Sequence, residues 1–241
     1  MAVILIPAPR KNSFVTDNLV KTNFSASDTL FVGSAMRESP VIFRSFVQFD
    51  LKAIPANLEV ASVTLRMFIK RNDLGEATKI FDVHRVVQRF KENEITWRKQ
   101  PDWDWEIEAS VHVTGGNIQD VEWDITELVR RWSRNEAKNY GLLIKAREEE
   151  DRYLVAFESR KSPNASHRPS LLVVVNEPQQ PEIAQGGNFV YDFKKNLTTS
   201  NTWQYTQSHP AKAAFYNYFI QNKGTNPAHL LVQVSPGAIE K

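Results

Sequence analysis

The side chains with the greatest capacity for chemistry gather at residues 90–105, FKENEITWRKQPDWDW. This stretch holds acids and tryptophans close together: Glu92, Glu94, Asp102, Asp104, Trp97, Trp103 and Trp105. A glycosidase cleft needs paired carboxylates, and a sugar-binding face needs exposed aromatic rings. The same residue types also pack the corners of β-sandwiches, so the stretch by itself leaves three interpretations open.

The acids of this stretch do not form a convincing catalytic pair. Glycoside hydrolysis requires two carboxylates that face each other across a bound sugar. Glu92 and Glu94 are two residues apart and would point to the same side of a strand. Lys91, Arg98 and Lys99 are near enough in sequence to neutralise them. We therefore predict that the protein is not an enzyme.

Metal and cofactor sites are not indicated either. The five histidines are dispersed, and no pair has the spacing of a zinc site. The chain has no G-x-S-x-G nucleophile elbow and no glycine-rich phosphate-binding loop. Asp120, Glu122 and Asp124 alternate and could offer oxygen ligands to calcium, although a solvated strand edge explains them more simply. The sequence predicts no metal and no cofactor.

The three tryptophans of the stretch differ in their patterns. Trp97 belongs to the alternating run at residues 94–97, which indicates packing in the core or at a corner. Trp103 and Trp105 flank Asp104, outside any clear periodic pattern. An exposed indole stacks on flat apolar faces such as sugar rings or partner surfaces. Packing, a subunit interface and a sugar platform all remain open, and Asp102, Trp103 and Trp105 are the candidate sugar- or partner-binding residues.

Short bursts of alternating apolar and polar residues dominate the rest of the chain, which is typical of strands in an antiparallel sandwich or barrel. They lie at residues 43–49, 61–69, 80–86, 142–144, 154–157 and 171–175. One segment, residues 124–135, predicts a helix that places Ile125, Leu128, Val129 and Trp132 on one face. The predicted fold is all-β: an antiparallel, jelly-roll-like β-sandwich with one short helix.

The charge and apolar content of the chain limit the kinds of partner that we expect. The chain has 241 residues and a formal net charge of only +2, so we expect no binding of nucleic acid. The N-terminal apolar run is too short for a signal peptide, and no segment has the roughly 20 apolar residues of a membrane span. We expect a protein made without a recognisable signal peptide that resides at a cell or spore surface.

The chain divides by composition. Residues 1–175 carry the sandwich pattern, residues 176–187 (NEPQQPEIAQGG) read as a linker, and residues 188–241 contain several strand-like runs. A segment as short as the last one rarely folds alone without disulfides or metal, and the chain has no cysteine. We therefore expect a small β-rich tail that packs on the sandwich or on a neighbouring subunit.

Two apolar runs near the ends of the chain are candidate subunit interfaces. The run at residues 3–6 forms either the N-terminal strand of the sandwich or a strand that is added to the sheet of a neighbouring subunit. The interface candidates are Val3, Ile4, Leu5, Ile6, Leu230, Leu231, Val232 and Val234. These runs predict a homo-oligomer or homopolymer.

An ordered series of motifs gives the chain a family resemblance. The series runs RSFVQFDL at 44–51, IP at 54–55, ASVTL at 61–65, ITW at 95–97, QP at 100–101, WDIT at 123–126, NYGL at 139–142 and RPSL at 168–171. Residues 13–175 thus resemble a DNRLRE domain, a bacterial and archaeal β-sandwich module related to some carbohydrate-binding modules. The six-letter motif itself is not intact, and its nearest string is DNL at 17–19.

The tail resembles a second family. Residues 188–241 are similar to the start of an uncharacterised domain that follows DNRLRE domains in spore-forming Gram-positive bacteria, through NKGTN at 222–226 and VSP at 234–236. The two resemblances imply a non-catalytic structural or adhesive surface protein of a spore-associated layer or fibre. The apolar runs near the ends of the chain predict that it self-associates through its terminal strands. The alternative is a carbohydrate-binding module that recognises a polysaccharide.

Overall fold

The computed structural model describes residues 1–36, 39–55, 58–149 and 153–176. The predicted tail, nearly all of the predicted linker and four interface candidates (Leu230, Leu231, Val232 and Val234) lie outside these residues. Apart from Asn176, the described residues are those of the predicted sandwich.

The described chain contains eleven strands, one α-helix and two short 3-10 helices. The strands are β1 (Ala2–Ile6), β2 (Lys11–Thr16), β3 (Thr29–Met36), β4 (Pro40–Gln48), β5 (Glu59–Asn72), β6 (Thr78–Val86), β7 (Trp103–Thr114), β8 (Asp120–Asp124), β9 (Leu142–Ala146), β10 (Leu154–Glu158) and β11 (Ser170–Asn176). The helices are η1 (Asp17–Leu19), α1 (Thr126–Ser133) and η2 (Ala165–His167).

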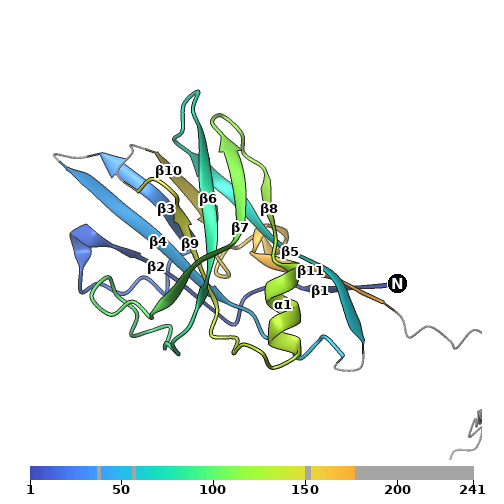
Figure 1. Ribbon diagram of the computed structural model, residues 1–241. Coiled ribbons are helices and arrows are strands. Elements are labelled where there is room, and N and C mark those ends of the chain that lie inside the picture. The colour runs from blue at the N-terminus through green and yellow to red at the C-terminus, as the bar shows by residue number, and fades with distance from the viewer. Residues whose placement is uncertain (37–38, 56–57, 150–152, 177–241) are drawn as a thin grey trace, which may run out of the picture. The chain divides into compact units, whose positions relative to one another are not determined.

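The strands form a curled antiparallel sheet that folds into two layers, and the long strand β5 belongs to both. Residues 59–66 of β5 pair with β11, which in turn pairs with β1, while β8 pairs with the other edge of β5. Residues 69–72 of β5 pair with β10, from which the sheet continues through β3, β4, β9, β6 and β7. Figure 1 shows these strands and the helix α1 beside β5. The predicted all-β sandwich with one short helix is confirmed.

The main core fills the space between the two layers. On β5, Val63, Leu65, Met67 and Ile69 are fully buried at every second position, as a half-buried strand requires. Trp123 of β8 joins the layers, because its indole Nε1–H donates a hydrogen bond of 3.0 Å to the carbonyl oxygen of Phe81 on β6. The predicted apolar face of the helix is confirmed: Ile125, Leu128, Val129 and Trp132 are all buried.

The predicted strand runs fall within β4, β5, β6, β9, β10 and β11, except that Phe49 lies one residue beyond the end of β4. Residues 103–114, which were not among the predicted runs, also form a strand, β7. The ladder between β6 and β7 shifts register twice, and these irregularities break the alternation by which a strand is recognised in sequence.

Gly33 marks the point where β3 changes partners. Residues 29–33 pair with β10 and residues 33–36 pair with β4. Gly33 has φ of +105°, and a Cβ placed on it would lie 2.0 Å from the carbonyl oxygen of Tyr153. Only glycine satisfies both the backbone angle and the close approach.

We predict that Gly33→Ala lowers the free energy of unfolding by about 3 kcal/mol or more, since strain at positive φ and a backbone clash act together. Gly116→Ala is the matched control: its φ is +79°, but no atom lies within 4 Å of the added Cβ. It should cost about 1 kcal/mol. Urea denaturation measures both variants, and equal losses would contradict the role of the Tyr153 carbonyl.

Candidate functional site

A second apolar cluster lies on the outer face of the sheet, away from the main core. Val15 and Phe46 belong to this cluster, whereas their chain neighbours Phe14 and Val47 belong to the main core. Because side chains alternate between the two faces of a strand, the clusters lie on opposite faces. The remaining members are Val86, Phe90, Ile95 and Leu143, with Trp97, Trp103 and Tyr140 packed against them. Residues 87–102, between β6 and β7, therefore cover this outer face.

Glu92 fastens the covering segment to the sandwich. Its Oε1 accepts hydrogen bonds from the backbone N–H of Asn12 and from Nε of Arg160, both at 2.9 Å, and its Oε2 accepts one from Nη2 of Arg160 at 2.6 Å. The Nδ2 of Asn23 donates to the carbonyl oxygens of Glu92 and Ile95 at 2.8 and 2.7 Å. A carboxylate bound in this way is occupied by anchoring contacts.

The other acids of residues 90–105 also lack the surroundings of a general acid. Glu94 is exposed, and its hydrogen bond with Lys91 holds the pKa of its carboxyl below the ordinary value. The backbone N–H of Glu106 and the guanidinium of Arg85 lower the pKa of Asp104 in the same way. General acid catalysis needs a shift in the opposite direction. Asp102 is exposed, and its carboxylate has no hydrogen-bond partner among the described residues.

Arg44 of β4 links the covering segment to β7 through aromatic contacts. Its guanidinium carbon lies 4.8 Å from the ring centroid of Trp97 and 5.1 Å from that of Trp103. Nε and Nη2 of Arg44 donate to the two carboxylate oxygens of Glu149 at 2.6 and 2.7 Å, and Nη1 donates to Oε1 of Gln100 at 3.3 Å. A cation held between two indoles and a carboxylate keeps Trp103 half-buried and oriented.

Trp105 projects from an irregular part of β7. Trp103 lies opposite Val86 of β6 and Ile107 lies opposite His84, so Arg85 alone faces the three residues 104–106. This bulge turns Trp105 outward, and the residue is 83% exposed. Its ring centroid is 5.9 Å from that of Trp103, and the two ring planes are inclined by 51°. We refer to Trp103 and Trp105 as the tryptophan ridge.

An ion pair between buried Asp82 and the exposed side chain of Arg147 lies farther along the same strands. Asp82 of β6 is buried. Its carboxylate accepts hydrogen bonds of 2.8 and 3.0 Å from Nη2 and Nε of Arg147, and one of 2.6 Å from the hydroxyl of Ser110. Burial opposes ionisation of Asp82, but the hydrogen bonds from Arg147 and Ser110 outweigh it and hold the pKa of its carboxyl below the ordinary value. The pair ties β6, β7 and the segment after β9 together.

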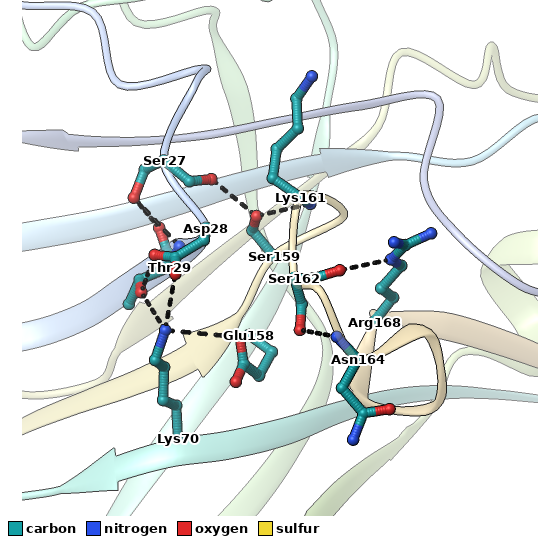
Figure 2. Close-up of polar contacts among 10 residues, drawn as sticks. All are labelled: Ser27, Asp28, Thr29, Lys70, Glu158, Ser159, Lys161, Ser162, Asn164 and Arg168. Carbon is teal, nitrogen blue, oxygen red and sulfur yellow. Dashed lines mark hydrogen bonds and ion pairs between the residues drawn. The ribbon is translucent and has the colours of Figure 1, made fainter.

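Figure 2 shows another polar cluster, where Lys70 of β5 meets Asp28 and Glu158. Nζ of Lys70 donates to Oδ2 of Asp28 at 2.9 Å and lies 3.7 Å from Oε2 of Glu158. The hydrogen bond with Asp28 raises the pKa of Lys70 and lowers that of Asp28. Nearby, the hydroxyl of Ser159 donates to the carbonyl oxygen of Ser27 at 2.7 Å. Both acids thus have a counter-ion within the fold, and the cluster joins β10 to β3 and β5.

Two of the three calcium candidates, Asp120 and Asp124, have partners within the chain. Oδ1 of Asp124 accepts a hydrogen bond of 2.9 Å from the backbone N–H of Thr126, and Asp120 lies 3.8 Å from Arg66. Among the residues that the structure describes, no three histidine or acidic side chains are grouped so that they could hold a metal ion. No helix within the described ranges is long and apolar enough to cross a membrane.

The N-terminal run forms the first strand of the sandwich, β1, which pairs with β11. Ile6 is buried in the core and Ile4 is half-buried against it. Val3 and Leu5 point outward and are 66% and 55% exposed. Only these two of the four N-terminal interface candidates are therefore freely accessible.

Comparison with known proteins places the chain in a family. Residues 6–175 match carbohydrate-binding module family 96, and no curated protein matches the chain. Because the match spans more than half of the chain, the protein belongs to this family. The match confirms the predicted relation of the domain to carbohydrate-binding modules. The DNRLRE name and the likeness of residues 188–241 to a spore-related domain remain predictions.

Several residues that shape the ridge were not singled out in the sequence. Arg44 alternates with Phe46 and so could be assigned to the same face, but Glu149 is 105 residues away from it. The Asn12 and Arg160 contacts of Glu92 span similarly long stretches of chain. Local sequence patterns do not reveal contacts between residues that are so far apart in the chain.

We predict that Glu92→Gln lowers the free energy of unfolding by about 1–3 kcal/mol, because it removes a charge-assisted pair that is largely shielded from solvent. Glu94→Gln makes the same chemical change two residues away at an exposed ion pair and should have little effect. Urea titration at neutral pH compares the two variants. If Glu92→Gln were as stable as Glu94→Gln, Glu92 would not be the anchor of the covering segment.

Proposed function

We propose that this protein binds a polysaccharide without cleaving it, and that the tryptophan ridge with Asp102 forms the binding surface. Membership of a carbohydrate-binding module family favours this function over a purely structural one. The proposed location of the binding surface rests on Trp105, which is 83% exposed and whose indole is free to stack on a sugar ring.

The ridge has the features of a ligand platform. Arg44 and Glu149 hold Trp103 on one side, so little ordering is needed when a ligand binds. Asp102 precedes the ridge directly, and its exposed carboxylate can accept hydrogen bonds from sugar hydroxyls. Stacking on an apolar face combined with a few polar contacts at its rim is a common way to bind a sugar.

The inclination of the two rings favours one kind of polysaccharide. Planes inclined by 51° cannot both lie flat on a single crystalline surface. They can contact a single chain whose successive sugar rings are turned relative to each other. We therefore propose a soluble chain, and not a crystalline fibre surface, as the ligand.

A glycan array followed by calorimetric titration of the soluble oligosaccharide that it identifies tests the proposal. Trp105→Ala should weaken binding about 30-fold or more, as expected for an aromatic residue at the centre of a contact. Ile118→Ala is the control, because Ile118 is also an exposed apolar residue, at 53%, in the turn after β7. Undiminished binding by Trp105→Ala would remove the ridge from the site.

Self-association through β1 is a second candidate function, and a specific observation favours it. Leu5 lies opposite Leu172 of β11, and Val3, Leu5 and Leu172 are all exposed. Residues 2–6 carry no charge, and in the described part of the chain β1 pairs only with β11. An open, uncharged edge strand can pair with the same strand of a second copy. Such contacts would suit a layer at a cell or spore surface.

The double variant Val3→Lys with Leu5→Lys should abolish any oligomer measured by light scattering after size exclusion, because charges on an edge strand oppose pairing. Ile118→Lys introduces a charge at an exposed apolar residue elsewhere and should leave the mass unchanged. A wild-type protein that stays monomeric at high concentration would refute association through β1.

A further inference from the structure

The bulge that carries Trp105 needs internal support. Because three residues of β7 face one residue of β6, backbone groups at residues 104–106 leave the regular ladder. Carbonyl groups without ladder partners must find other donors, or their desolvation destabilises the local structure. The carbonyls of Asp104 and Glu106, which lie directly before and after Trp105 in the chain, belong to this irregular part of the strand.

The side chain of His84 supplies the missing donor. Its Nδ1 lies 3.1 Å from the carbonyl oxygen of Asp104 and 3.0 Å from that of Glu106. Carbonyl oxygens only accept hydrogen bonds, so Nδ1 carries the proton and donates to both. His84 is only 6% exposed, and its ring therefore sits beneath the bulge with little competition from water.

The bulge has one further restraint, from Asp104. Oδ1 of Asp104 accepts a hydrogen bond of 3.2 Å from the backbone N–H of Glu106, and Oδ2 accepts one of 2.5 Å from Nη2 of Arg85. These contacts restrain the backbone around Trp105 through the side chain of Asp104. His84 differs from them because it binds the backbone on both sides of Trp105 with one atom.

We infer that His84 is a positioning residue for carbohydrate binding: its Nδ1–H holds the backbone on either side of Trp105 and so fixes the direction of the exposed indole. The consequence for binding rests on the function proposed above, whereas the consequence for the order of Trp105 does not. A side chain held in place before binding loses less conformational entropy when the ligand arrives. His84 thus contributes to affinity without touching the sugar.

Substitution of His84 by asparagine or by leucine distinguishes the effect of losing the hydrogen bond from the effect of losing the volume of the ring. The amide nitrogen of Asn, like Nδ1 of His, is bonded directly to Cγ, so His84→Asn keeps a donor at the same place. The leucine side chain of His84→Leu is branched at Cγ like that of asparagine, but it has no hydrogen-bond donor. Both variants lose the imidazole ring, and any cost of the resulting space is therefore common to the two.

The indole N–H signal of Trp105 in a 15N NMR spectrum reports its order, and Trp105→Phe assigns the signal by removing it. His84→Leu should lower the 15N–1H heteronuclear NOE of Trp105 clearly, while His84→Asn should retain it. The buried indole of Trp123, which donates to Phe81, is the internal standard and should not change. If His84→Leu does not fold, His84→Gln replaces it, since its donor sits one bond farther from the backbone.

Calorimetric titration with the oligosaccharide identified on the array gives the second readout. His84→Leu should bind about three- to tenfold more weakly than the wild type, and His84→Asn should bind within about twofold of it. An unchanged NOE of Trp105 in His84→Leu would overturn the inference, as would equal binding by the Asn and Leu variants where the wild type binds. A lowered NOE in His84→Leu together with no glycan binding by the wild type would support His84 as the support of Trp105 and would refute the proposed function alone.

Discussion

The apolar side chains on the outer face of β4, β6 and β9 impose the constraint on which the candidate site depends. Phe46, Val86 and Leu143 point away from the main core, and leaving them in water would expose a large apolar patch. A sheet that is apolar on both faces needs a cover on each. The second layer of the sandwich covers one face, and residues 87–102 cover the other with Phe90, Ile95 and Trp97.

This cover determines where the tryptophan ridge lies. Its main anchor is Glu92, which forms an ion pair with Arg160 and accepts a hydrogen bond from the backbone of β2. Its aromatic end meets Arg44, which is held between Trp97 and Trp103. The chain then enters β7 with Trp103 packed and Trp105 free. The acids that suggested catalysis in the sequence are thus mostly partners of arginine and lysine, and the aromatic residues divide between packing and display.

Display of a large apolar side chain is compatible with a stable fold only if the backbone beneath it is secured. The bulge of β7 is secured from within by His84 and from outside by Asp104 with Arg85. Among the described strands β7 pairs only with β6. Such an edge strand suits a binding site, because one of its sides is open to a ligand while the other remains in the ladder. Membership of a carbohydrate-binding module family supports the proposal that this arrangement binds a polysaccharide.

The sequence by itself determined the all-β sandwich, because burial on one face of a strand leaves an alternation that can be read locally, as in Val63, Leu65 and Met67. It also marked Trp103 and Trp105 as exceptional, since both lie outside such a pattern. Only the tertiary structure decided that Trp97 and Trp103 hold Arg44, that Trp105 is the exposed one of these three tryptophans, and that His84 supports it. Those relations depend on register shifts and on contacts between residues such as Arg44 and Glu149, 105 positions apart, which hydrophobic periodicity does not encode.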